Sequence, residues 1–273
     1  MLIYSKEGST KSTNQFSKPL NNQKKNIYTM LYLIGLGLNN EKDITVNGLE
    51  SIKKCSLIYL EQYTSKLSCS VKQLEKFYKK KIIASDREQI ENKAYEIIKN
   101  AKTKDVAVLI IGDVFGATTH INLMMDAKAE KVKVKVIHNT SILTAIGITG
   151  LELYKFGKIT SIPFNNKDVR APIDVFNMNY KNDLHTLFLL DLNPKDNQFM
   201  TIKDAVDYLI KNKINENTLA VGCAGLGSDK HELKTATLKQ LKNKKFTQFP
   251  QCLIIPSKKL HFVEEEALDL WKH

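Results

Sequence analysis

MLYLIGLGL, residues 30–38, is the segment that most clearly indicates how this chain folds. It is an apolar run that ends in Gly35 and Gly37, a pattern typical of a buried strand that runs into a tight turn. Residues 1–29 are rich in Ser, Thr, Asn, Gln and Lys, and they contain too few large apolar groups to offset the entropy of ordering. We therefore expect a disordered leader at 1–29 and a folded protein that begins at Met30.

Short apolar segments then alternate with helical patterns. Ser85 and Glu88 have the spacing of a capping box ahead of an apolar periodicity. The expected strands are 31–36, 57–60, 81–84, 106–111 and 132–137, and the expected helices are 44–54, 86–101 and 118–130. Alternation of this kind predicts a parallel α/β sheet.

The second half of the chain has a different rhythm, and no internal repeat is visible. Its expected strands are 186–192, 219–224 and 252–255, and its expected helices are 202–213 and 263–271. The segment 165–182 is polar and shows no clear periodicity, which predicts a surface loop. We expect a boundary near 138–141, so that a leader (1–29) precedes an N-terminal α/β domain (30–139) and a C-terminal α/β domain (140–273).

The composition limits the class of protein but not its chemistry. The 273 residues suit one large domain or two of ordinary size, and the formal net charge is +12. Five lysines and one glutamate in the leader contribute +4, which leaves +8 for the rest. A basic surface is compatible with nucleic acid or with an acidic protein partner, and charge alone does not choose between them.

Targeting signals and cysteine spacing give further expectations. No apolar run approaches the roughly 20 residues that cross a bilayer, and the N-terminus lacks the apolar core of a signal peptide, so we expect a soluble, cytoplasmic protein. Cys55, Cys69, Cys223 and Cys252 lie far apart, which indicates neither a disulfide framework nor a zinc site. Cys55 and Cys252 are interpreted as core residues.

The first glycine turn has two interpretations. Gly35-Leu36-Gly37 resembles the start of a dinucleotide fingerprint, and Glu61 after the second strand would be available to hold a ribose. Asn40, however, stands where the third glycine belongs. The alternative is a tight turn after a strand.

Two more polar loops follow predicted strands. Asp113 and Gly116 lie in GDVFGATTH (112–120), and Ser141 lies in HNTSI (138–142). Open α/β sheets bind ligands at the carboxyl ends of their strands, so these loops would converge on one ligand. The alternative is that they are ordinary turns, with Ser141 as a helix cap. The sequence contains no phosphate-binding P-loop, no nucleophile elbow and no histidine spacing typical of a metal site.

Several blocks in fixed order resemble one family. MLYLIGLGL (30–38), FGATTH (115–120) and VIHN (136–139), with further blocks up to LLD (189–191), are similar to the diphthine synthases, which belong to the tetrapyrrole-methylase-like methyltransferases. The resemblance implies two α/β domains with S-adenosylmethionine in the cleft between them, usually in a homodimer. It implies methylation of the modified histidine of translation elongation factor 2. The wording FGATTHINL and HNTSI is typical of eukaryotic members, which transfer four methyl groups and yield diphthine methyl ester.

The resemblance also assigns residues. Gln251 stands at the place of a family histidine and retains a hydrogen-bond donor, whereas Gly225 replaces an arginine and Val114 a proline. The implied cofactor contacts are Leu38, Asp113, Gly116, Ser141, Ile142, Leu190, Leu226 and Gln251.

The implied chemistry requires little of the protein beyond alignment. A sulfonium methyl group is already activated, so no nucleophilic residue is needed, and His120 is the candidate for a base. We expect the basic surface to steer the translation factor, with neither nucleic acid nor membrane as partner. The alternatives are a family methyltransferase that acts on a tetrapyrrole or ribosomal RNA, and a cofactor-binding protein that has lost catalysis.

Overall fold

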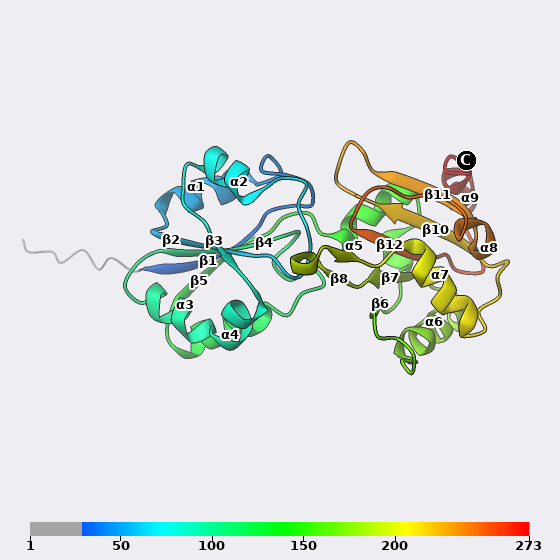
Figure 1. Ribbon diagram of the computed structural model, residues 1–273, viewed down its shortest axis with the longest axis horizontal. Coiled ribbons are helices and arrows are strands. Elements are labelled where there is room, and N and C mark those ends of the chain that lie inside the picture. Colours follow the sequence, from blue (N-terminus) through cyan, green and yellow to red (C-terminus); the bar gives the residue numbers. More distant parts are fainter. Residues whose placement is uncertain (1–28, 273) are drawn as a thin grey trace, which may run out of the picture.

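The computed structural model describes residues 29–272, so the predicted leader lies outside the described residues except for its last position. Two five-stranded sheets, each covered by helices, lie side by side along the long axis of the molecule (Figure 1). The strands of the first sheet come from residues 30–137 and those of the second from residues 160–255. The predicted α/β class with two sheets is confirmed.

The first sheet is entirely parallel, with the order β3-β2-β4-β1-β5. Its strands are β1 (Met30–Gly35), β2 (Leu57–Glu61), β3 (Ile83–Ser85), β4 (Val106–Ile110) and β5 (Lys133–Ile137). In β1, Leu31 and Leu33 enter one core cluster while Tyr32 and Ile34 enter the other. Burial on both faces explains why this strand reads as a continuous apolar run.

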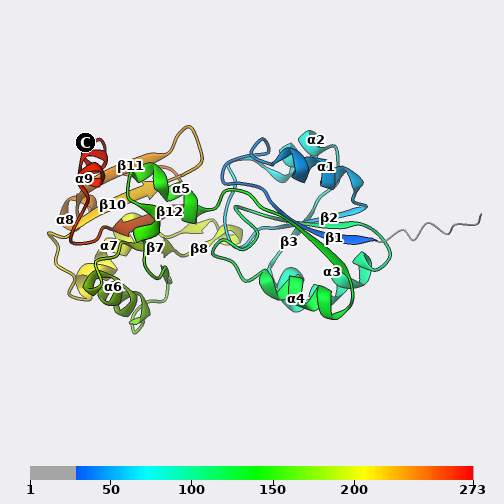
Figure 2. The same ribbon diagram turned by 180° about the vertical axis from the view of Figure 1, so that it is seen from behind.

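Helices cover both faces of this sheet (Figures 1 and 2). On one face lie α1 (Val46–Lys54), capped by the Thr45 hydroxyl, and α2 (Val71–Tyr78), a helix that was not predicted from the sequence. On the other lie the short π-helical turn η1 (Glu88–Asn92), α3 (Ala94–Ala101) and α4 (Ile121–Ala129).

The predicted capping box at Ser85 is wrong. Ser85 is the last residue of β3 and pairs with Glu61, and its hydroxyl donates to the carbonyl of Ile83. Asp86 instead accepts a hydrogen bond from the Gln89 amide at 3.0 Å. The expected helix over 86–101 is divided into η1 and α3 because the π-helical turn interrupts it.

The second sheet is mixed, with the order β11-β10-β12-β7-β6. Only β6 and β7 pair in parallel. Its strands are β6 (Thr160–Ile162), β7 (Thr186–Leu190), β10 (Leu219–Ala224), β11 (Glu232–Thr237) and β12 (Gln251–Ile255). The hairpin β8 (Leu192–Asn193) and β9 (Gln198–Phe199) extends from the end of β7.

Helices cover both faces of the second sheet as well. The short helix α5 (Ile142–Ala145) and helix α9 (Phe262–Asp269) cover one face. The other face is covered by α6 (Ala171–Lys181), α7 (Ile202–Lys211) and α8 (Leu238–Leu241).

The predicted surface loop at 165–182 is wrong, because most of it is helix α6. Pro172 lies in the first turn of α6, where a missing amide hydrogen costs nothing. Ile173 and Phe176 are buried against the second sheet, and Tyr180 packs beside them. Their spacing is helical, and the polar residues between them obscured it.

Within residues 29–272, none of the helices is long and apolar enough to cross a membrane. All four cysteines are free. The prediction that Cys55 and Cys252 belong to the core is confirmed, since their exposed fractions are 1% and 3%.

Candidate functional site

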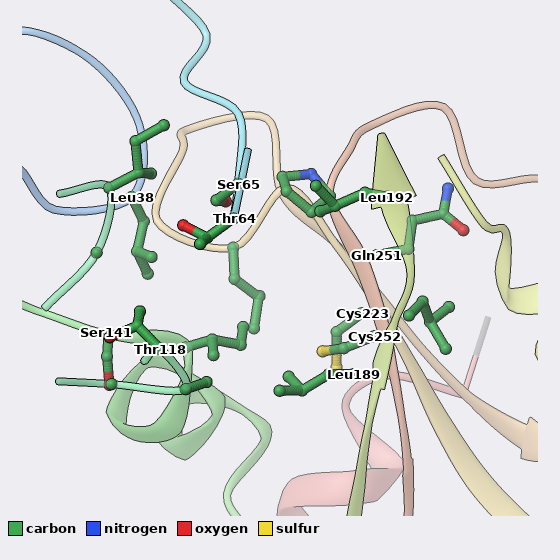
Figure 3. A pocket seen from close by; sticks show the side chains of 18 residues that line it. Leu38, Thr64, Ser65, Thr118, Ser141, Leu189, Leu192, Cys223, Gln251 and Cys252 are labelled. Carbon is green, nitrogen blue, oxygen red and sulfur yellow. The ribbon is translucent and has the colours of Figure 1, made fainter. Parts of the chain in front are cut away.

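A cavity lies between the carboxyl edge of the first sheet and the strands of the second (Figure 3). Its empty volume is about 790 Å³, part of which is open to solvent. Leu38, Thr64, Thr118 and Ser141 come from loops that follow β1, β2, β4 and β5. The opposite wall is formed by β7, β10 and β12 with their loops. The predicted convergence of the polar loops after the parallel strands is therefore what the structure shows.

A backbone bridge joins the loops after β1 and β4. The Gly112 amide donates to the Gly37 carbonyl at 2.7 Å, and the Gly37 amide donates to the Gly112 carbonyl at 3.2 Å. Both glycines have a positive φ, +80° at Gly37 and +84° at Gly112, a backbone conformation that residues with a side chain rarely adopt. Helix α1 begins only at Val46, so Gly37 does not lead directly into a helix N-terminus. The dinucleotide interpretation of this turn is wrong, and the tight-turn alternative is correct.

Gly112 leaves room where a side chain would fill the cavity. A Cβ built at Gly112 would find its nearest atoms at 3.7 Å in Leu38, at 3.9 Å in the Thr140 carbonyl and at 4.0 Å in Ser141, and Leu38 and Ser141 line the cavity. At Gly116 a Cβ would lie only 2.5 Å from the Ser141 Cβ. The first glycine therefore keeps the cavity open, and the second lets two of its loops touch.

Asp113 holds the rim of the cavity together. Its carboxylate accepts hydrogen bonds from the Phe115 amide at 3.0 Å, the Asn139 amide at 3.0 Å and Nδ1 of His138 at 2.9 Å. Partial burial opposes its ionisation, but these hydrogen bonds outweigh burial and lower the pKa of Asp113. Asn139 extends the network by donating from Nδ2 to the carbonyls of Gly35 and Asp43, each at 3.0 Å.

Glu61 does not face a ribose, contrary to the dinucleotide interpretation. Its side chain is fully buried, and it accepts hydrogen bonds from the amides of Tyr63, Thr64 and Ile111 and from the Thr64 hydroxyl. These bonds fix the loop after β2, from which Thr64 and Ser65 line the cavity. Neither residue was predicted from the sequence to belong to the site, although both follow a predicted strand.

The wall from the second sheet is largely apolar. Leu189, Leu190 and Leu226 line it, and Cys223 and Cys252 lie opposite each other on β10 and β12. The hydrogen bond to Cys252 and burial both raise the pKa of the Cys223 thiol, so it stays uncharged. This wall therefore offers surface for an apolar or aromatic group rather than for a charge.

Gln251 lines the cavity, but its amide group is engaged elsewhere. Oε1 accepts from the Ile202 amide at 2.8 Å, and Nε2 donates to the Gln248 carbonyl at 3.0 Å. These two bonds fix the amide group against the protein and leave one Nε2 hydrogen for a further acceptor. Gly225, at the place of the missing arginine, donates its amide to the Pro250 carbonyl at 2.9 Å.

His120 lies away from the cavity. Its ring is 2% exposed, at the start of α4, and it borders a separate small hollow with Ile90 and Leu123. Burial lowers its pKa to about 4, and its Nε2 lies 3.4 Å from the hydroxyl of Tyr63. The structure does not bring this candidate base to the cavity wall.

Among the residues that the structure describes, no group of three or more His, Cys, Asp or Glu side chains is placed to hold a metal ion.

Residues 30–242, which contribute most of the cavity, match the tetrapyrrole (corrin/porphyrin) methylases. The chain belongs to the tetrapyrrole methylase family. Diphthine methyl ester synthase of Dictyostelium discoideum is 39% identical over 89% of this chain and 98% of its own length. The human diphthine methyl ester synthase is 39% identical over 89% of this chain and 95% of its own. A crystal structure of a diphthine synthase superposes with a TM-score of 0.85 and 36% identity over 89% of this chain and 96% of that chain.

Tetrapyrrole methylases use S-adenosylmethionine as methyl donor, and the cavity fits this group. Leucine side chains form an apolar part of the wall, Gly112 leaves room beside them, and Thr64, Thr118 and Ser141 add hydroxyl-bearing side chains to the lining. Of the contacts predicted from sequence, all but Asp113 line this cavity, and Asp113 lies next to Gly112 at its rim.

Proposed function

We propose that this chain is an S-adenosylmethionine-dependent methyltransferase that methylates the modified histidine of translation elongation factor 2 and yields diphthine methyl ester. The observation that carries the proposal is the cavity, because its walls belong to the region that matches the methylase family. Identity of 39% over 89% of this chain to diphthine methyl ester synthases supports the choice of substrate.

We assign the methyl donor to the cavity of Figure 3. Leu38, Ile142, Leu190 and Leu226 would hold it by apolar contact, and Gly116 and Ser141 shape the loops around it. When bound, S-adenosylmethionine supplies a methyl group that is already activated for transfer. Fixing two reactants in line contributes about 7–11 kcal/mol to the rate, so the protein acts chiefly by orientation.

A second hollow gives a route for the protein substrate. It shares Ser65, Ile111 and Leu192 with the first cavity and has an empty volume of about 1770 Å³. Lys66 and Arg87 lie on its wall, together with residues of the β8–β9 hairpin. We propose that the segment with the modified histidine enters here, because the hollow shares lining residues with the donor cavity. Its three cationic residues, Lys66, Arg87 and Lys195, outnumber Asp86 and Asp191 and suit the carboxylate of the side chain.

The assembly and location are also part of the proposal. We propose a homodimer, for which exposed apolar side chains offer a surface at the start of α9 (Phe262 and Val263) and in the neighbouring segment (Leu153 and Tyr154). We propose the cytoplasm, where translation factors act. We retain the division into residues 30–139 and 140–273, since β5 ends at Ile137 and β6 begins at Thr160.

Mass spectrometry of elongation factor 2 tests the function. Factor that carries the unmethylated histidine modification is incubated with the protein and S-adenosylmethionine, and we expect four successive methyl additions. No addition to the factor, with methylation of a tetrapyrrole or ribosomal RNA instead, would overturn the proposal. Calorimetric titration with S-adenosylmethionine distinguishes a protein that binds the cofactor without catalysis from one that does not bind it.

A further inference from the structure

Glu61 is a buried carboxylate at the end of β2. Its exposed fraction is 0%, and within residues 29–272 it forms no salt bridge. Oε2 accepts from the amides of Tyr63 at 3.4 Å and Thr64 at 3.1 Å, while Oε1 accepts from the amide of Ile111 at 3.3 Å. A carboxylate that is buried without a cation is costly, so burial favours the protonated form of Glu61.

The remaining hydrogen bond connects Glu61 to the cavity. The Thr64 hydroxyl donates to Oε1 of Glu61 at 2.5 Å, and Thr64 lines the donor cavity (Figure 3). A hydroxyl that donates to a carboxylate keeps lone pairs to accept from another group. The hydroxyls of Thr118 and Ser141 on the same wall bond to the backbone instead: Thr118 donates to the Val114 carbonyl at 2.8 Å, and Ser141 accepts from the Leu143 amide at 3.2 Å.

Thr64 also lies where a substrate would arrive. It lines both the donor cavity and a neighbouring open hollow whose wall includes Arg87 and Phe115. The adjacent residue Ser65 borders the larger hollow that we assign to the protein segment. The hydroxyl is thus placed between the donor site and the surface.

We propose that Thr64 and Glu61 form a proton relay that removes a proton from the substrate amino group before the nitrogen is methylated. The inference rests on the proposed function. The N–H bond breaks and leaves its electron pair on nitrogen, the Thr64 oxygen takes that proton, and the Thr64 hydroxyl proton passes to Oε1 of Glu61. Thr64 contacts the substrate, and Glu61 acts through it. The proton returns to solvent by the reverse path once the product has left.

The surroundings of Glu61 favour proton uptake. Burial raises its pKa above the ordinary range and outweighs the hydrogen bonds from Thr64, Ile111 and Tyr63. The nearest other titratable groups are directed elsewhere. The Tyr63 hydroxyl bonds to Glu91 at 3.2 Å and lies 3.4 Å from His120, and the Arg87 guanidinium lies over the Tyr63 ring.

The reaction itself offers a discriminating readout. An amine must lose its proton before it attacks a methyl group, whereas a carboxylate is already ionised at neutral pH. The relay therefore serves the three additions to nitrogen and not the addition that forms the ester. A variant in which the relay is broken should lose methylation of the amino nitrogen and keep formation of the ester.

The test compares two substrates at saturating S-adenosylmethionine. One is elongation factor 2 with the unmethylated amino group, and the other is the same factor with the amine already trimethylated. For Thr64→Val we expect the rate of amine methylation at pH 7 to fall about a hundredfold, within the usual contribution of acid–base catalysis, and ester formation to change less than threefold. Thr64→Ser should restore the ratio of the two rates, and Glu61→Gln should lower it as Thr64→Val does.

The pH profile and a matched control complete the test. The deficit of Thr64→Val should shrink as pH rises, because the amine then loses its proton to solvent. Thr118→Val removes another hydroxyl of the same wall and should keep the wild-type ratio of the rates. An equal loss of both reactions in Thr64→Val, or a loss independent of pH, would overturn the relay. Absence of both reactions in the wild-type protein would instead overturn the proposed function.

Discussion

Replacing Glu264 by glutamine should remove much of the acid sensitivity of the second half of the chain. The Glu264 side chain is 1% exposed and accepts four hydrogen bonds. The donors are Nε2 of His185 at 2.8 Å, Nζ of Lys155 at 3.0 Å, and the amides of Glu152 and His261 at 3.0 and 2.9 Å. Nδ1 of His185 accepts from the Ser257 amide, so the neutral ring donates from Nε2.

The size of the effect follows from the pKa. Burial opposes ionisation of Glu264, but the hydrogen bonds from Glu152, His261, Lys155 and His185 outweigh it and lower the pKa from 4.5 to about 2. Each pKa unit corresponds to about 1.4 kcal/mol, so the ionised carboxylate contributes about 3 kcal/mol to the free energy of unfolding. Because the folded pKa is depressed, this contribution is present above pH 4.5 and is lost as the pH falls toward 2. About 2 kcal/mol of it should be gone by pH 3.

Urea unfolding followed by tryptophan fluorescence measures this contribution. The only tryptophan is Trp271, which follows α9 and packs against the adjoining core cluster. Glu264→Gln should be less stable than the wild type by about 3 kcal/mol at pH 7, and the difference should narrow toward pH 3. Burial lowers the pKa of His185, which adds a further loss below pH 6.5 in both proteins. A difference in stability between the two proteins that stays constant from pH 7 to pH 3 would show that Glu264 is not ionised with a depressed pKa in the folded protein.

Three further predictions follow from the fold and the site. Gly112→Ala places a Cβ in the cavity at φ +84°, so we expect at least tenfold weaker binding of S-adenosylmethionine by calorimetry with an unchanged circular dichroism spectrum. Asn179→Ala should lower the free energy of unfolding by about 3 kcal/mol in urea titrations, because the buried Asn179 bonds to both backbone groups of Lys158 and to the Thr186 hydroxyl. If the excess of positive charge steers the translation factor, KM for the factor should rise with ionic strength while KM for the methyl donor stays constant; parallel changes would contradict steering.

The alternation of strands and helices made the first sheet predictable. Strands buried on both faces are continuous apolar runs, and Leu31 to Ile34 show this in four consecutive residues. The second half was harder because helix α6 hides Ile173 and Phe176 among polar residues, and strand β6 has only three residues. Helix α2 was missed although Ser70 and Gln73 form a capping box there.

The candidate site divides in the same way. Position after a strand identified Gly112, Gly116 and Ser141, since the carboxyl ends of parallel strands share one edge of the sheet. The place of a residue after a strand could not show that Glu61 is fully buried or that His120 borders another hollow. Those properties depend on which way each side chain points once neighbouring elements have packed.

The family, the parallel sheet and the loops that build the cavity could all be predicted from the sequence, because strand periodicity and ordered motifs are local properties of the chain. Which polar groups face that cavity became clear only from the folded arrangement. Asp113 and Gln251 form hydrogen bonds within the protein, whereas Thr64 connects a buried carboxylate to the cavity wall. Most of these hydrogen bonds join residues far apart in sequence, as from Asn139 to Asp113 and from Ile202 to Gln251, and only packing of the elements brings such partners together.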